Sequence, residues 1–323
     1  LKPLRAEVFQ NVAIPIKDRW YDDALVPLDL CDAAGSIRAI TAQALPVTGR
    51  QRQTFTVEIY IPKDSRAGEY AFSIAVRVAG VDHRLNVCLR VHAFDLPNEP
   101  ACTADINNYS RSPGEGFEGA LDDPARYLKI ERAYFREARR HRAMFHLLPY
   151  THAGRLEPGF APDLAGRGNS RHVKDWRPFD RHWGACLDGS AYRGIHGGWT
   201  WPVEYLYTPV NLNWPAYFEN FGKPGYEAEF RNVLGEMVRH FDRRRWTRTR
   251  FEVFFNHKSR ARFYPWDMDE IRFERDNGAT EYFARLTNEV AKPFPRVKMI
   301  NRIDSSWIFE KTARTAMADL VQL

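Results

Sequence analysis

The chain has 323 residues, of which 44% are hydrophobic and 27% are charged. This length suits two domains better than one very large core, and this composition excludes a disordered chain and a bundle of membrane spans. The formal net charge is +6, but no zinc-finger spacing, basic zipper or aromatic RNA-binding signature accompanies it. We therefore expect a folded protein that binds neither nucleic acid nor a membrane.

Alternating apolar residues indicate antiparallel strands in the first third of the chain. From residue 53 onward, apolar side chains occupy every second position, and turn residues separate the runs. Such alternation is typical of strands with one buried face, so residues 1–97 are predicted to form an antiparallel β-sandwich domain. The expected strands lie near 5–15, 35–43, 55–61, 70–78 and 85–91.

The periodicity changes after the proline-containing stretch FDLPNEPA at 94–101. Beyond it, short apolar runs alternate with amphipathic helices, as in strand–helix units on a parallel sheet, and the large loops favour a (β/α)8-type (TIM) barrel over 98–323. About five strands can be identified, so the barrel is expected to be incomplete at the C-terminus. The expected strands are 102–108, 143–149, 203–210, 250–256 and 296–303; the expected helices are 124–142, 225–243, 279–291 and one from about 308.

In such a barrel, the loops at the carboxyl ends of the strands carry the functional residues. Here those loops are rich in tryptophan and in hydrogen-bonding side chains. Aromatic faces stack on sugar rings, while polar side chains supply the directional hydrogen bonds that a polyhydroxylated ligand needs, so we predict a carbohydrate site. The expected substrate-binding residues are Asn107, Tyr109, Asp180, Asp188, Trp201, Asn211, Asn213, Trp214, Asn256, His257, Lys258, Trp266, Arg302 and Asp304.

The segment FYPWDMDEIRF, residues 263–273, places three carboxylates among large apolar residues. One interpretation is a solvated helix start. The other is a catalytic pair, because glycoside cleavage needs a proton donor and a second group that handles the positive charge at the anomeric carbon. Apolar neighbours raise the pKa of a carboxyl group, which suits the donor. The adjacent Asp269 and Glu270 suit a division of labour, in which one orients a substrate group and the other acts as the acid.

Several stretches resemble the glycoside hydrolase 123-like family over nearly the whole chain: YDDALVPL, IPKDSRAGEY, VHAFDLPNEP, DWRPFDRHWGACLDGSAY, LYTPVNLNWP, FFNHK and WDMDE. The resemblance implies a β-sandwich joined to a (β/α)8 barrel and a retaining, substrate-assisted β-N-acetylgalactosaminidase activity. It also implies that Asp269 orients and stabilises the acetamido group and that Glu270 is the general acid and then the base. The family usually has proline after this pair, where this chain has Ile271.

Two alternatives stay open: a noncatalytic glycan-binding relative of the same fold, and a binder of nucleic acid or acidic polymers through a basic surface. The chain has no HExxH, CxxC or GxSxG motif and no glycine-rich phosphate loop, so we expect neither a metal nor a cofactor. The four scattered cysteines favour buried free thiols. We expect a secreted or periplasmic protein, although no secretory segment opens the chain.

Overall fold

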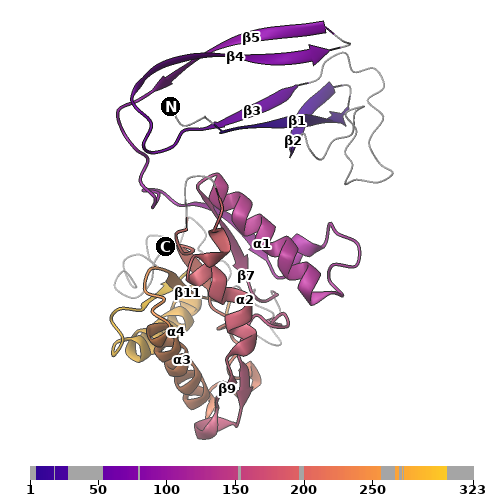
Figure 1. Cartoon of the computed structure of the whole chain (residues 1–323). Helices are drawn as coiled ribbons and strands as arrows, with labels where there is room; N and C mark the ends of the chain where they lie inside the picture. The colour runs from indigo at the N-terminus through magenta and orange to yellow at the C-terminus, as the bar shows by residue number, and fades with distance from the viewer. Residues whose placement is uncertain are drawn as a thin grey trace. The chain divides into compact units, whose positions relative to one another are not determined.

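A computed structural model of the protein describes residues 5–17, 19–27, 54–78, 81–151, 154–195, 200–255, 266–268, 271 and 273–303. The chain divides into two compact units, Leu1–Pro97 and Asn98–Leu323 (Figure 1). The expected strand near 35–43 and the expected helix from about 308 lie outside the described residues. None of the helices in the described ranges is long and apolar enough to cross a membrane.

The first unit contains two antiparallel sheets. Strands β1 (Arg5–Ile16), β2 (Arg19–Pro27) and β3 (Phe55–Tyr60) form one sheet in the order β2-β1-β3. Strands β4 (Gly68–Val78) and β5 (Val81–Val91) form a hairpin that stays in register along its whole length. The alternation of apolar residues located β3, β4 and β5, and β1 coincides with the strand expected near 5–15, whereas β2 was not predicted.

The predicted β-sandwich is not what the structure shows, because the two sheets remain small and separate. A sandwich needs a continuous apolar interior between its sheets. Among the described residues of this unit, the buried hydrophobic side chains are Phe9, Ala13 and Val91, and most of the others are exposed or half-buried. Alternation along a strand indicates which side is apolar but not what covers that side.

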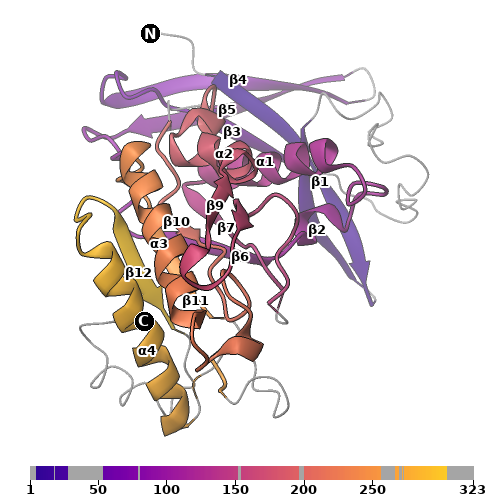
Figure 2. The ribbon, with the colours of Figure 1, turned by 90° about the horizontal axis from the view of Figure 1, so that it is seen from below.

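The second unit contains two parallel sheets. Strands β6 (Ala104–Tyr109) and β7 (Ala143–Leu148) pair with each other, and β10 (Tyr205–Tyr207), β11 (Arg250–Phe254) and β12 (Lys298–Arg302) form a second sheet in that order. Figure 2 shows α4 alongside β12 and α3. The helices are α1 (Pro124–Arg140), α2 (Arg177–Leu187), α3 (Tyr226–Arg243) and α4 (Glu274–Ala291). The remaining elements are the antiparallel pair β8 (Asp163–Ala165) and β9 (His172–Asp175) and the short 3-10 helices η2 (Ser112–Gly114), η3 (Gly168–Ser170), η4 (Ser190–Tyr192) and η5 (Phe218–Asn220).

The predicted (β/α)8 barrel was wrong for the part of the chain that the structure describes. That part has four α-helices and several small sheets, none of them closed. Strands β7 and β10 lie side by side, but they are joined by a contact from the Tyr205 amide to Met144 Sδ at 3.3 Å instead of a backbone ladder. Strand β10 has only three residues and pairs through its backbone with β11 alone. The alternation of strands and helices in the sequence therefore did not produce a closed barrel among the described strands.

Helix α3 supplies much of the core of the second unit. Its apolar residues recur at helical spacing and form one fully buried face, as the sequence predicted. Phe241 on this face stacks on Phe251 of β11, with 4.0 Å between the ring centroids. Glu227 and Glu229 lie in the first turn and Arg243 in the last, where each charge complements the helix dipole. These contacts hold α3 against the strand that carries part of the candidate site.

The long segment between β7 and β10 is packed and partly helical. The sequence suggested a loop there, but the segment contains α2 and the β8–β9 pair. The fully buried Trp183 of α2 donates a hydrogen bond from Nε1 to the Phe160 carbonyl at 3.1 Å. After α2, Gly189 turns the chain with a φ of 82°, and a Cβ at this position would lie 2.2 Å from the Thr200 carbonyl oxygen. Only glycine fits this turn without displacing backbone.

We expect Gly189→Ala to destabilise the protein by more than the roughly 1–2 kcal/mol that left-handed backbone costs, because the added methyl group also meets a carbonyl oxygen. The matched control is Gly278→Ala in the exposed face of α4, where a Cβ meets nothing within 4 Å. That change is expected to stabilise by up to about 1 kcal/mol. Urea unfolding of the three proteins tests this, and equal midpoints for the two variants would contradict it.

Candidate functional site

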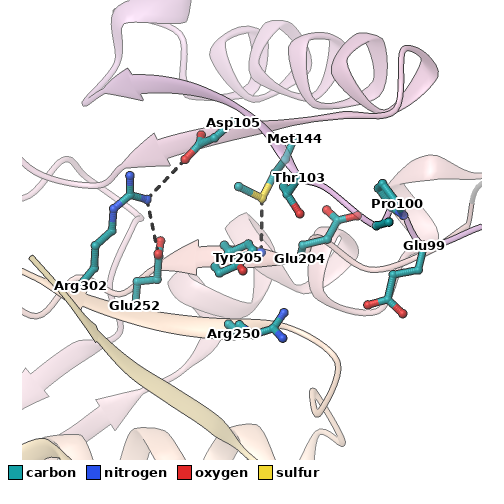
Figure 3. Close-up of a pocket in the computed structure, with 11 residues that line it drawn as sticks. Glu99, Pro100, Thr103, Asp105, Met144, Glu204, Tyr205, Arg250, Glu252 and Arg302 are labelled. Atoms are coloured by element: carbon teal, nitrogen blue, oxygen red, sulfur yellow. Dashed lines mark hydrogen bonds and ion pairs between the residues drawn. The ribbon is translucent and has the colours of Figure 1, made fainter. Parts of the chain in front are cut away.

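The second unit contains a polar cavity of about 460 Å³ (Figure 3). Most of its lining comes from the amino ends of the parallel strands and from the segment that leads into β6. The volume falls within the range of small-molecule sites in proteins. The lining residues are Glu99, Pro100, Ala101, Thr103, Asp105, Met144, Glu204, Tyr205, Arg250, Glu252 and Arg302.

Strand register explains why four side chains from β10, β11 and β12 share this cavity. Arg250 and Glu252 are two residues apart on β11, so they point to the same face of the sheet. The ladder pairs Tyr205 with Arg250 in β10, and it pairs Arg302 of β12 with Phe254, which has the same parity as Glu252. The same face of these strands therefore carries Tyr205, Arg250, Glu252 and Arg302.

At one end of the cavity, four charged or titratable groups form a cluster. The buried His146 of β7 contacts Asp105 of β6 through Nδ1 at 2.9 Å. Its Nε2 lies 2.7 Å from Glu252 Oε2, an ion-pair contact whose angles are not those of a hydrogen bond. Arg302 Nη1 reaches Asp105 Oδ2 at 3.3 Å and Glu252 Oε1 at 3.4 Å (Figure 3). The cluster therefore connects both parallel sheets.

The charges in this cluster are set by mutual stabilisation against burial. Burial opposes the charged form of His146, but the hydrogen bond to Asp105 and the close contacts with both carboxylates outweigh it, so the pKa of His146 lies above its usual value. Burial also opposes the charge on Asp105, but His146 and Arg302 outweigh it and lower the pKa of that carboxyl group. Tyr207 stacks on His146 at 3.7 Å, and burial keeps its hydroxyl protonated by raising its pKa far above the usual range.

Glu204 lines the cavity but has a structural partner. Arg139 of α1 grips it in a bidentate pair, with Nη2 at 2.9 Å from Oε2, and both side chains are buried. Such pairs fix geometry, because removing one partner leaves a buried charge uncompensated. Glu204 is therefore a wall of the cavity and an anchor for α1.

The cluster is not arranged as a metal site. Asp105 lies at Nδ1 of His146 and Glu252 lies at Nε2. The imidazole and the two carboxylates therefore do not point toward one common position where a metal ion could bind. The described residues contain no group of three or more His, Cys, Asp or Glu side chains that could hold a metal. Among the described cysteines, Cys88 and Cys102 are exposed free thiols and Cys186 is a buried one.

Of the described substrate-binding residues that the sequence predicted, Arg302 alone lines the cavity. Asn107 and Tyr109 lie on β6 with exposed side chains, 3.5 Å apart through Nδ2 and the hydroxyl. Six predicted residues, Asp269 and Glu270 among them, lie outside the described residues: Asn256, His257, Lys258, Asp269, Glu270 and Asp304.

The other predicted residues have packing or turn contacts. Asn211 is fully buried, and its Oδ1 accepts a hydrogen bond from the Asn213 amide at 2.8 Å. Asp188 caps the turn after α2, and Asp180 contacts His240 of α3 at 2.8 Å. Trp214 and Trp266 pack on the core, and Trp201 lies beneath the Arg248 guanidinium at 3.8 Å. Asn211, Asn213 and Trp214 share one turn after β10, and Phe218, whose amide donates to Asn213 Oδ1, packs against Trp266. The structure thus brings part of the predicted set together, but not at the cavity.

The site residues predicted from the sequence do not include Asp105, His146 or Glu252. The signal that could have identified His146 and Glu252 is a charged or titratable residue inside a short apolar strand, as in AMFHLL and RFEVF. An ionisable group there needs a partner from another strand, because an unpaired buried charge is costly.

No model of a known protein family and no curated protein matches this chain. The likeness to glycoside hydrolases therefore rests on the quoted sequence stretches.

The pH dependence of stability should report on His146. Because the pKa of His146 is raised in the folded protein, its charge stabilises the fold fully at pH values below 6.5, the pKa in the unfolded chain. This stabilisation is lost as the pH rises through the pKa in the folded protein. The lowered pKa of Asp105 means that its contribution is present above 3.8 and is lost as the pH falls through the folded value. The cluster is thus most stabilising between these two values.

We expect the urea concentration at the unfolding midpoint of the wild type to decrease as the pH is raised from about 5.5 to about 9. The decrease should be smaller for His146→Gln, because glutamine does not titrate. Comparing the two proteins removes the contributions of the other histidines. A His146→Gln protein with the same pH dependence as the wild type would show that His146 does not carry this effect.

Proposed function

We propose that this protein is a glycoside hydrolase that acts on a carbohydrate, and that the polar cavity is part of its sugar-binding site. The observation that supports this most is the convergence of carboxylate and guanidinium groups on one cavity of ligand size. A sugar presents hydroxyl groups that both donate and accept hydrogen bonds, and this lining offers partners for both. Tyr205 adds an aromatic surface of the kind that packs on sugar rings.

The contacts of Arg302 set an upper limit on the separation of the two cluster carboxylates, and this limit lies within the range found in glycosidases. Arg302 Nη1 contacts both, at 3.3 Å from Asp105 Oδ2 and 3.4 Å from Glu252 Oε1, so these oxygens are no farther apart than the sum of the two distances. Glycosidase carboxyl pairs are separated by about 5 to 9.5 Å, depending on the stereochemical course.

Asp105 is suited to a charged role. Its lowered pKa keeps it ionised near neutral pH, so it can accept hydrogen bonds from hydroxyl groups or stabilise positive charge, but it cannot be the proton donor. The donor must then be another carboxyl group. The sequence resemblance supplies Glu270 for that role and Asp269 for holding the acetamido group of a β-N-acetylhexosaminide.

Noncatalytic glycan binding is the second candidate. It is favoured by the way in which His146 and Arg302 hold both Asp105 and Glu252. Carboxylates fixed by cations can still bind sugar hydroxyls, but they are less free to act in bond cleavage.

Hydrolysis of a panel of aryl glycosides that includes β-N-acetylhexosaminides tests the proposal. We expect turnover by the wild type and a kcat/KM about 10²- to 10⁴-fold lower for Glu270→Gln, because the variant lacks a general acid. Glu274→Gln is the matched control, since Glu274 is exposed at the start of α4.

Equal rates for Glu270→Gln and the wild type would remove Glu270 from the mechanism. Binding of glycans without turnover of any aryl glycoside would favour the noncatalytic candidate, and binding of no glycan would refute both.

A further inference from the structure

The charges that line the cavity are mostly neutralised within the protein. Asp105 and Glu252 face His146 and Arg302, and Glu204 is paired with Arg139. The cavity therefore has no large excess of negative charge, although four of its lining residues are acidic.

Arg250 differs from the other cations of the site. Within the described ranges, its guanidinium has no carboxylate at ion-pair distance; it lies over the Tyr205 ring at 5.3 Å from the centroid. Figure 3 shows this guanidinium directed away from the group formed by Arg302, Asp105 and Glu252. Arg250 is half-buried, so its orientation is held by packing on the tyrosine and by the strand beneath it.

We propose that the cavity binds an acidic sugar, a ring that carries an anionic group, and that Arg250 pairs with this group. This inference rests on the proposed function for the sugar and adds the charge of the ligand. A guanidinium presents a planar fork of N–H donors that matches the oxygens of a carboxylate or sulfate. Thr103 and the paired carboxylates remain as partners for the ring hydroxyl groups.

The free charges of the lining favour an anion over a cation. The lining acid without a described ion-pair partner is Glu99, which is exposed on the segment before β6. Charge pairs at exposed positions are weakened by solvent and salt, whereas pairs at half-buried positions are weakened less. An ion pair between a ligand anion and Arg250 is thus expected to stabilise binding more than an ion pair between a ligand cation and Glu99.

The test is calorimetric titration of the whole chain with glucuronic acid, with glucose 6-sulfate and with glucose as the neutral reference. We expect at least one of the acidic sugars to bind about tenfold or more tightly than glucose, as expected for a charge-assisted pair. The tighter of the two identifies the anion as a carboxylate or a sulfate. Arg250→Met should remove the preference for the acidic sugar, and Arg250→Lys should keep part of it.

Arg285→Met is the matched control, because it removes the same charge from an exposed ion pair on α4, away from the cavity lining. It should bind the acidic sugar as the wild type does. Because Arg250→Lys retains the charge but lacks the planar fork of donors, it separates the contribution of the charge from that of the guanidinium geometry.

Glucose bound as tightly as both acidic sugars, or an acid preference that survives in Arg250→Met, would overturn this inference and leave the proposed glycoside hydrolase intact. Aryl glycoside turnover, measured separately, decides that function.

Discussion

The position of His146 between two carboxylates is the constraint on which the second unit depends. Asp105 belongs to β6 and Glu252 to β11, so the contacts of one imidazole join two sheets whose described strands share no backbone ladder. Burial opposes the charges of His146 and Asp105, and these charges are favourable only because their partners are present. Loss of a partner therefore changes the titration of His146 or Asp105 as well as the packing.

The sequence predicted local structure well and long-range arrangement poorly. Periodicity located α1, α3, α4 and the parallel strands, because side-chain burial on a helix or strand repeats with that element's geometry. It did not predict α2, whose residues lie in what looked like a long loop. It also gave a closed barrel where the described strands form open sheets, because closure depends on which edges meet, and β7 meets β10 through Met144 rather than through backbone hydrogen bonds.

The site shows the same limit. Function was expected at the carboxyl ends of the strands, and the described cavity opens mainly at the amino ends, on Glu99, Thr103, Met144, Tyr205 and Arg250. The charged cluster connects these two levels, since Glu252 is central in β11 and Arg302 is the last residue of β12. Residues that looked suitable for binding because of their type, such as Asn211, proved to be satisfied by nearby backbone groups. Residue type alone does not show whether hydrogen bonds are already used internally.

Internal pairing also determines which residues of the cavity can respond to a ligand. Asp105, Glu204 and Glu252 already hold cations, so a ligand that competes for them must break contacts that stabilise the fold. Arg250 contacts only an aromatic face among the described side chains, and a ligand can engage it without such a loss. Two groups of residues in one cavity thus have different roles. The cluster around His146 keeps the strands in position, and the half-buried guanidinium beside Tyr205 is available to pair with a ligand.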